Sequence, residues 1–145
     1  AAPAERQGVR LAVENMQANH LCDDLVEMGR FLASLRLPWA GVCFDSGHAH
    51  LCGQTERMSA LVPYILSTHL HDNHGKSDEH LPPFRGDVRW HTVAAALARA
   101  DGAQVLMLEV GPDQHAGVVP SLESARRLRS MLARERRRPP IIRKR

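Results

Sequence analysis

Residues 41–48 read Gly-Val-Cys-Phe-Asp-Ser-Gly-His, a short apolar run that closes on a carboxylate and an imidazole. Such a run is typical of a buried strand. Three other apolar runs also end on a residue that can bind a metal or move a proton, namely Glu14, His69 and Glu109. Segments with helical spacing follow the runs. Strand and helix patterns in alternation predict an α/β protein with a parallel sheet.

The pattern divides the chain into four strand–helix units. We expect strands over residues 8–14, 41–45, 65–71 and 104–109. We expect helices between Asp23 and Pro38, near residues 55–62, over residues 90–100 and from Ser121 onward. A loop rich in Asp, His, Gly and Pro covers residues 72–88. The run 104–109 is almost wholly apolar, which predicts a strand buried on both faces.

The four strand ends also suggest a barrel. In a parallel barrel, functional residues lie where the strands end and the following loops begin. A complete (β/α)8 barrel needs about 200 residues or more, whereas this chain has 145. The sequence therefore predicts about half of a TIM (β/α)8-type barrel.

The formal net charge of +3 averages two different segments. Residues 126–145 carry +9, because they hold ten basic residues and one acid, while residues 1–125 carry −6. A terminal basic run is typical of a solvated extension. We therefore expect a functional body over 1–125, and the end of the last helix with a basic tail over 126–145. The acidic body argues against a nucleic-acid partner, since DNA binding needs many phosphate contacts.

The composition also bears on location. No stretch approaches the ~18 apolar residues that span a bilayer, and residues 1–8 show neither the basic nor the apolar region that is typical of a secretion signal. The three cysteines are an odd number and form no Cys-x-x-Cys pair. These features predict a reduced, cytoplasmic protein without a membrane partner.

Two strand ends carry paired donors. Asp45 and His48 offer oxygen and nitrogen donors that suit a divalent metal, although such a pair can equally be a turn cap beside a surface histidine. His69 and His71 lie on one face of a strand because side chains alternate. Two buried imidazoles each need a partner. The alternative is a pair of core histidines bonded to backbone.

Further carboxylates lie near these donors. Glu14 and Glu109 end apolar strands, where a glutamate is rarely buried unless it is paired or binds a metal. The alternative is two solvated acids. Asp78 and His80 form either another carboxylate–imidazole pair or ordinary loop polarity. Asp72 is expected to orient His69 or His48.

Six short motifs carry a family resemblance. They are V-E-N (13–15), F-D-S-G-H (44–48), H-L-H-D (69–72), D-E-H-L (78–81), G-D-V-R-W (86–90) and L-E-V (108–110). In this order they resemble the C-terminal half of the xylose isomerase-like TIM barrels. That superfamily contains sugar and sugar-phosphate isomerases and epimerases and also endonuclease IV, of AP endonuclease family 2. The resemblance covers most of residues 8–112.

The resemblance implies a metal-dependent isomerase or epimerase of carbohydrate metabolism, with a small sugar as substrate. It matches Glu14, Asp45, His69 and Glu109 to the ligands of one divalent ion, which is Mn, Mg, Co or Zn. Glu14 and Glu109 would exchange a proton with the carbon next to a carbonyl that the metal polarises. His48 would act beside them on the substrate. His71 and Arg85 are also expected to bind substrate.

Two alternatives remain open at this point. An endonuclease IV-like phosphodiesterase acting on abasic DNA would bind up to three zinc ions, with His48, Asp78 and His80 as additional ligands. The residues Ser46 and Gly47 disfavour it, because such endonucleases typically have Thr-Cys there. A truncated, non-catalytic fragment is the other alternative. It would need a missing N-terminal half or a homo-oligomer to cover its two open sheet edges.

Overall fold

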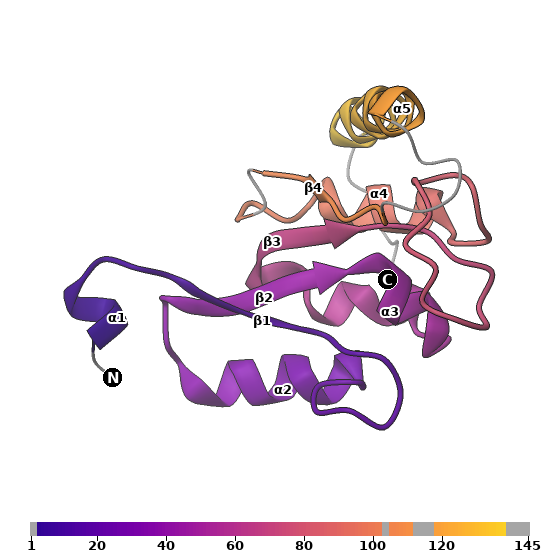
Figure 1. Ribbon diagram of the computed structural model, residues 1–145. Helices are drawn as coiled ribbons and strands as arrows, with labels where there is room; N and C mark the ends of the chain where they lie inside the picture. The colour runs from indigo at the N-terminus through magenta and orange to yellow at the C-terminus, as the bar shows by residue number, and fades with distance from the viewer. Residues whose placement is uncertain (1–2, 103–104, 112–117, 139–145) are drawn as a thin grey trace, which may run out of the picture.

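The computed structural model describes residues 3–102, 105–111 and 118–138, and it contains one parallel sheet (Figure 1). The strand order is β1-β2-β3-β4, and all three strand pairs are parallel. The strands are β1 (Leu11–Glu14), β2 (Ala40–Asp45), β3 (Ile65–Leu70) and β4 (Met107–Leu108). The predicted α/β class and parallel sheet are confirmed. The expectations for Gln104 and for residues 139–145 lie outside the described residues.

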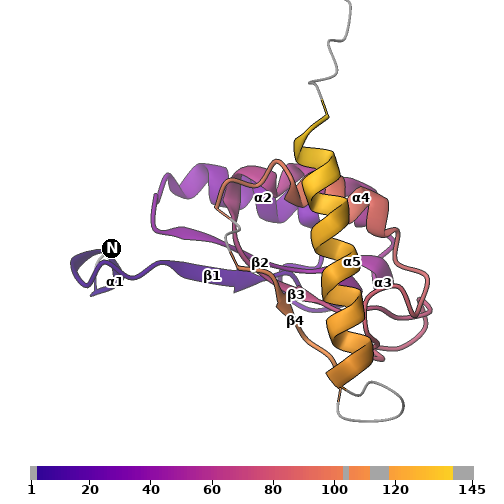
Figure 2. The same cartoon turned by 90° about the horizontal axis from the view of Figure 1, so that it is seen from above.

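Helices lie before, between and after the strands. They are α1 (Pro3–Arg6), α2 (Leu25–Leu35), α3 (Ser46–Leu51), α4 (Trp90–Leu97) and α5 (Val118–Arg136), with 3-10 helices η1 (Thr55–Ala60) and η2 (Val62–Tyr64). Figure 2 shows α2 and α4 along the same side of the sheet. The helix η1 packs against both of them, and α5 packs against α4. In the described part of the chain, no helix is both long and apolar enough to cross a membrane.

The core lies between the sheet and this helical layer. Leu25, Met28 and Leu32 repeat at helical spacing on α2 and are buried. They meet Val42 and Phe44 of β2, which are fully buried. Burial of such side chains contributes about 1.5–3 kcal/mol each, so these contacts stabilise the packing of α2 against the sheet.

Residues 46–51 form the helix α3, which the sequence did not predict. The Asp45 side chain accepts a hydrogen bond from the His48 N–H and begins this helix. The prediction for the last strand was wrong. The last strand is short and is not buried on both faces: Met107 is 49% exposed and Val105 is 65% exposed. The reason is that β4 is the edge of the sheet, and no described strand pairs with its outer side.

The opposite edge, β1, is equally open. Its side chains Leu11 and Val13 are 49% and 45% exposed, and Val9 just before it is 50% exposed. No described strand pairs with the outer side of β1. A parallel sheet is normally covered on both faces and closed or capped at its edges. The sheet therefore has the form of an open part of a larger parallel assembly.

Candidate metal centre

Four donor side chains gather where the strands end. Glu14, Asp45 and His69 lie at the carboxyl ends of β1, β2 and β3, and Glu109 follows β4 directly. The register pairs Asp45 with His69. One donor atom from each of the four residues lies within 4.8 Å of the others. The structure thus brings together all four residues that the sequence predicts as metal ligands, although their binding of an ion stays a prediction.

The chemistry of this group fits a divalent cation. His69 Nδ1 lies 3.0 Å from Glu109 Oε2 and 3.3 Å from Glu14 Oε1. This nitrogen is buried, yet it has no hydrogen-bond partner among the described residues. Three carboxylates around a nitrogen without a hydrogen bond form a set of oxygen and nitrogen donors that suits zinc, manganese or cobalt. Side-chain exposures of 28% for Glu14 and 42% for Glu109 leave the group open to solvent.

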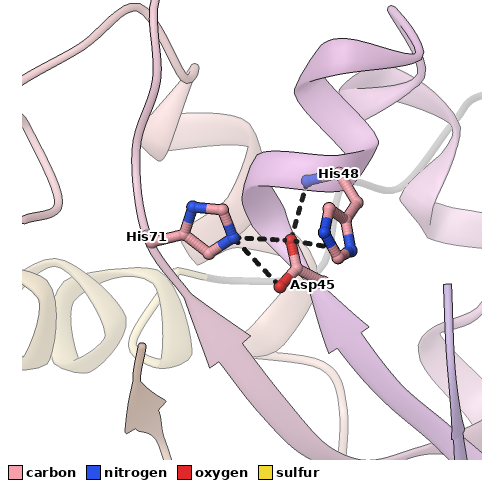
Figure 3. A group of neighbouring side chains, drawn as sticks. All are labelled: Asp45, His48 and His71. Carbon is pink, nitrogen blue, oxygen red and sulfur yellow. Dashed lines mark hydrogen bonds and ion pairs between the residues drawn. The ribbon is translucent and has the colours of Figure 1, made fainter. Parts of the chain in front are cut away.

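Both carboxylate oxygens of Asp45 accept hydrogen bonds (Figure 3). Oδ1 accepts a 2.7 Å hydrogen bond from the His48 backbone N–H, and Oδ2 accepts one of 3.1 Å from Nε2 of His71. Asp45 and His71 are both fully buried. Burial by itself lowers the pKa of His71. The hydrogen bond to Asp45 and the charges of Asp45, Asp78 and Glu109 together outweigh it, so the pKa is raised above the usual value.

Asn15 joins the ends of β1 and β2. Its buried side-chain amide donates to the Asp45 carbonyl at 3.0 Å and accepts from the Asp45 N–H at 2.8 Å. The side chain thus replaces the next pair of ladder bonds after Glu14. The Asn15 carbonyl also accepts from Nδ1 of His48 at 3.0 Å. Sequence reasoning did not find this role, although the V-E-N motif could have signalled it, because an Asn directly after a strand can bond to backbone.

A second group of donors surrounds Asp78. Its Oδ2 lies 3.2 Å from Nε2 of His48 and 3.1 Å from Nε2 of His80. The Nδ1 atoms of these two rings face the carbonyls of Asn15 and Glu109. A carbonyl can only accept, so Nδ1 carries the hydrogen in both rings. In the neutral rings, both Nε2 lone pairs therefore face the carboxylate, an arrangement that a proton or a cation would relieve.

Other predicted site residues lie differently. Asp72 does not orient His69 or His48, and that prediction was wrong: its carboxylate accepts from the Trp90 indole and from three backbone N–H groups of the 72–88 loop. Arg85 is exposed, and its side chain makes no hydrogen bond or ion pair within the described residues. Substrate contact by Arg85 or His71 stays a prediction.

Comparisons with known proteins bear on the family and the fold. The family model of xylose isomerase-like TIM barrels matches residues 1–134. The chain is 30% identical over 112 residues to the uncharacterized protein y4fM of Sinorhizobium fredii, an alignment covering 75% of this chain and 36% of y4fM.

Solved structures show the same fold. A D-tagatose 3-epimerase-like protein is 23% identical, with a TM-score of 0.72 over 91% of this chain and 50% of its own. The IolI protein, solved with a bound zinc atom, is 16% identical, with a TM-score of 0.73 over 91% of this chain and 52% of its own. The chain thus spans about half the length of these structures, and the likeness is one of fold.

Proposed function

The chain belongs to the xylose isomerase-like TIM barrel family, and on that premise we propose that it is the metal-binding half of a sugar or sugar-phosphate isomerase or epimerase. The observation that carries the proposal is the meeting of Glu14, Asp45, His69 and Glu109 at the strand ends. Residue types, strand positions and donor spacing all agree with one divalent ion. The zinc atom in the IolI structure supports this choice of cofactor.

The residues divide the chemistry between them. A bound divalent ion would polarise a sugar carbonyl. Glu14 and Glu109 flank His69 from two strands and are the most exposed carboxylates of the group. They are the general acid and base that move a proton on the neighbouring carbon. His48, whose Nδ1 is fixed by Asn15, directs Nε2 toward Asp78 and orients a substrate oxygen beside them.

A complementary half completes the enzyme. The open edges at β1 and β4 expose Leu11, Val13 and Met107. Four further strand–helix units, pairing in parallel with both edges, would cover them and supply further sugar contacts. A second copy of this chain is the less favourable complement, because it would bring another three strand-end carboxylates to the same end of the barrel.

A zinc phosphodiesterase of the endonuclease IV type is the second candidate function. The geometry around Asp78 favours it, since two imidazole nitrogens face one carboxylate oxygen. The residues Ser46 and Gly47 and the charge of −6 over 1–125 count against it. We retain the isomerase or epimerase as the main proposal.

Metal titration of the purified chain tests the proposal. Calorimetry with Mn²⁺, Co²⁺ and Zn²⁺ should detect one ion at micromolar concentration, and His69→Ala and Glu109→Ala should each abolish stoichiometric binding. His91→Ala and Glu123→Ala are matched controls, because both residues are exposed and lie outside the group. A chain that binds no divalent ion at micromolar concentration contradicts the proposal.

Activity assays separate the two enzyme classes. Ketose epimerisation and abasic-site cleavage are measured side by side, with the chain alone and with a complementary half. The proposal expects epimerisation that depends on added metal and on Glu14. Cleavage of abasic DNA with three bound zinc ions would replace it with the phosphodiesterase.

A further inference from the structure

We propose that His71 is a positioning residue that fixes the carboxylate of Asp45 for metal binding. The inference rests on the proposed function and gives His71 a role through Asp45, in place of the direct substrate contact expected from the sequence. His71 has no exposed surface. Its Nε2 lies 3.1 Å from both oxygens of Asp45. Figure 3 shows the ring beside Asp45 with Nε2 directed at both carboxylate oxygens, so His71 acts through Asp45.

Ser46 and Gly47 fix the position of His71. The Ser46 hydroxyl donates to the His71 carbonyl at 2.8 Å and accepts from the His71 N–H at 3.1 Å. A Cβ at Gly47 would overlap the His71 ring. Two consecutive residues of the F-D-S-G-H motif thus hold a histidine that lies 25 and 24 positions further along the chain. This pairing gives a physical reason for Ser-Gly at positions 46 and 47.

Other rings complete the enclosure. His80 stacks on His71 with a centroid distance of 4.1 Å and an interplanar angle of 6°, and His48 meets it edge-on at 5.8 Å. A ring packed on several sides cannot turn without moving its neighbours. Nε2 is therefore kept toward Asp45, while the buried Nδ1 faces Gly47 and finds no hydrogen-bond partner in the part of the chain that the structure describes.

The fixed position of the His71 ring in turn affects the carboxylate of Asp45 in the metal group. A buried carboxylate needs donors, and Asp45 has one on each oxygen, from the His48 N–H and from His71. With both oxygens held, the carboxylate keeps one orientation next to His69. Loss of such an outer partner typically costs 10–100-fold in metal affinity. Two variants separate the hydrogen bond from the packing: His71→Phe keeps a ring without a donor, and His71→Gln keeps a donor without a ring.

Cobalt binding by the whole chain tests the inference. The affinity for Co²⁺ is measured by calorimetry, and the visible spectrum of bound Co²⁺ reports the geometry around the ion. His71→Phe should weaken Co²⁺ binding by about 10–100-fold and shift the spectrum, while His71→Gln should restore most of the affinity. His91→Phe, on the exposed side of α4, is the control. Circular dichroism confirms that each variant is folded.

A second measurement needs no metal. In the metal-free chain, nuclear magnetic resonance should show a slowly exchanging Nε2–H of His71 that disappears in Asp45→Ala. A rapidly exchanging Nε2–H overturns the inference. So does Co²⁺ binding by His71→Phe that equals the wild type, or by His71→Gln that falls as far as that of His71→Phe. Absence of Co²⁺ binding by the wild-type chain overturns the proposed function and the role of His71 with it.

Discussion

The indole nitrogen of Trp90 donates a 2.7 Å hydrogen bond to Oδ2 of Asp72, which ties the first residue of α4 to the loop after β3. The same carboxylate accepts from the backbone N–H groups of Asn73, Phe84 and Val88 at 2.9–3.0 Å. Asp72 is fully buried. One side chain thus supplies the acceptors for a loop of irregular backbone, which has few ladder bonds of its own.

Asp72→Asn should therefore destabilise the chain strongly. The substitution replaces one carboxylate oxygen with an NH2 group, which then faces N–H groups that donate to that oxygen in the wild type. A buried donor without a partner costs about 1–3 kcal/mol. We expect a loss of about 3 kcal/mol in the free energy of unfolding, measured by urea titration with tryptophan fluorescence. Asp87→Asn is the control, because Asp87 is exposed in the same loop. Equal stability of the two variants would contradict this role of Asp72.

Gly47→Ala should destabilise the folded chain because of the His71 ring. The added Cβ overlaps His71, and overpacking of this kind costs about 1–3 kcal/mol. In a His71→Ala background the ring is absent, so Gly47→Ala should cost much less there. The double-mutant cycle, measured by urea unfolding, gives the coupling directly. The same cost in both backgrounds would show that the methyl group is excluded by something other than His71.

The strand ends could be predicted from the sequence because their signal is local. Each apolar run closes on a charged or ionisable residue, and parallel strands place their carboxyl ends at one edge. That reasoning located Glu14, Asp45, His69 and Glu109, which the structure brings into one group. It needed no knowledge of how the loops fold.

The features that the sequence did not predict correctly depend on residues far away along the chain, which a local sequence pattern does not reveal. The sequence suggested that Asp72 orients His69 or His48, whereas its donors come from as far away as Trp90. The apolar run before Glu109 predicted a buried strand, but burial depends on a neighbouring strand that is absent from the outer side of β4 in the described residues. Residue 47 is a glycine because of a ring 24 positions along the chain.

Cys43 should be the least reactive of the three cysteines. Burial raises the pKa of its thiol to about 11, against a smaller lowering by the hydrogen bond with Ser67. The thiolate is the nucleophile, and with that pKa its fraction at pH 8 is on the order of one in a thousand. Alkylation of Cys43 by iodoacetamide, followed by peptide mass spectrometry, should rise about tenfold per pH unit from pH 8 to pH 10.

The other two thiols provide the comparison for Cys43. The pKa values of Cys22 and Cys52 are also raised by burial, but both side chains are partly exposed. They should therefore react first at every pH. Modification of Cys43 at pH 8 as fast as that of Cys22 would show that the β2 strand is more open than the structure indicates.

Asp24 should stabilise α2 in a pH-dependent way. Its Oδ1 accepts from the N–H groups of Val26 and Glu27 at 2.8 and 2.9 Å, and the hydrogen bond from Glu27 is the main cause of its lowered pKa. Asp24→Ala should cost about 1 kcal/mol at pH 7, whereas Asp24→Asn should keep most of the cap. Because the folded-state pKa is lowered, the charge contributes stability above the unfolded value of 3.8, and this contribution is lost as the pH falls through the folded value. Urea unfolding of the wild type and Asp24→Asn should give curves that approach each other below about pH 4. A difference between them that stays constant down to pH 2 would mean that the carboxylate charge at Asp24 does not stabilise the helix.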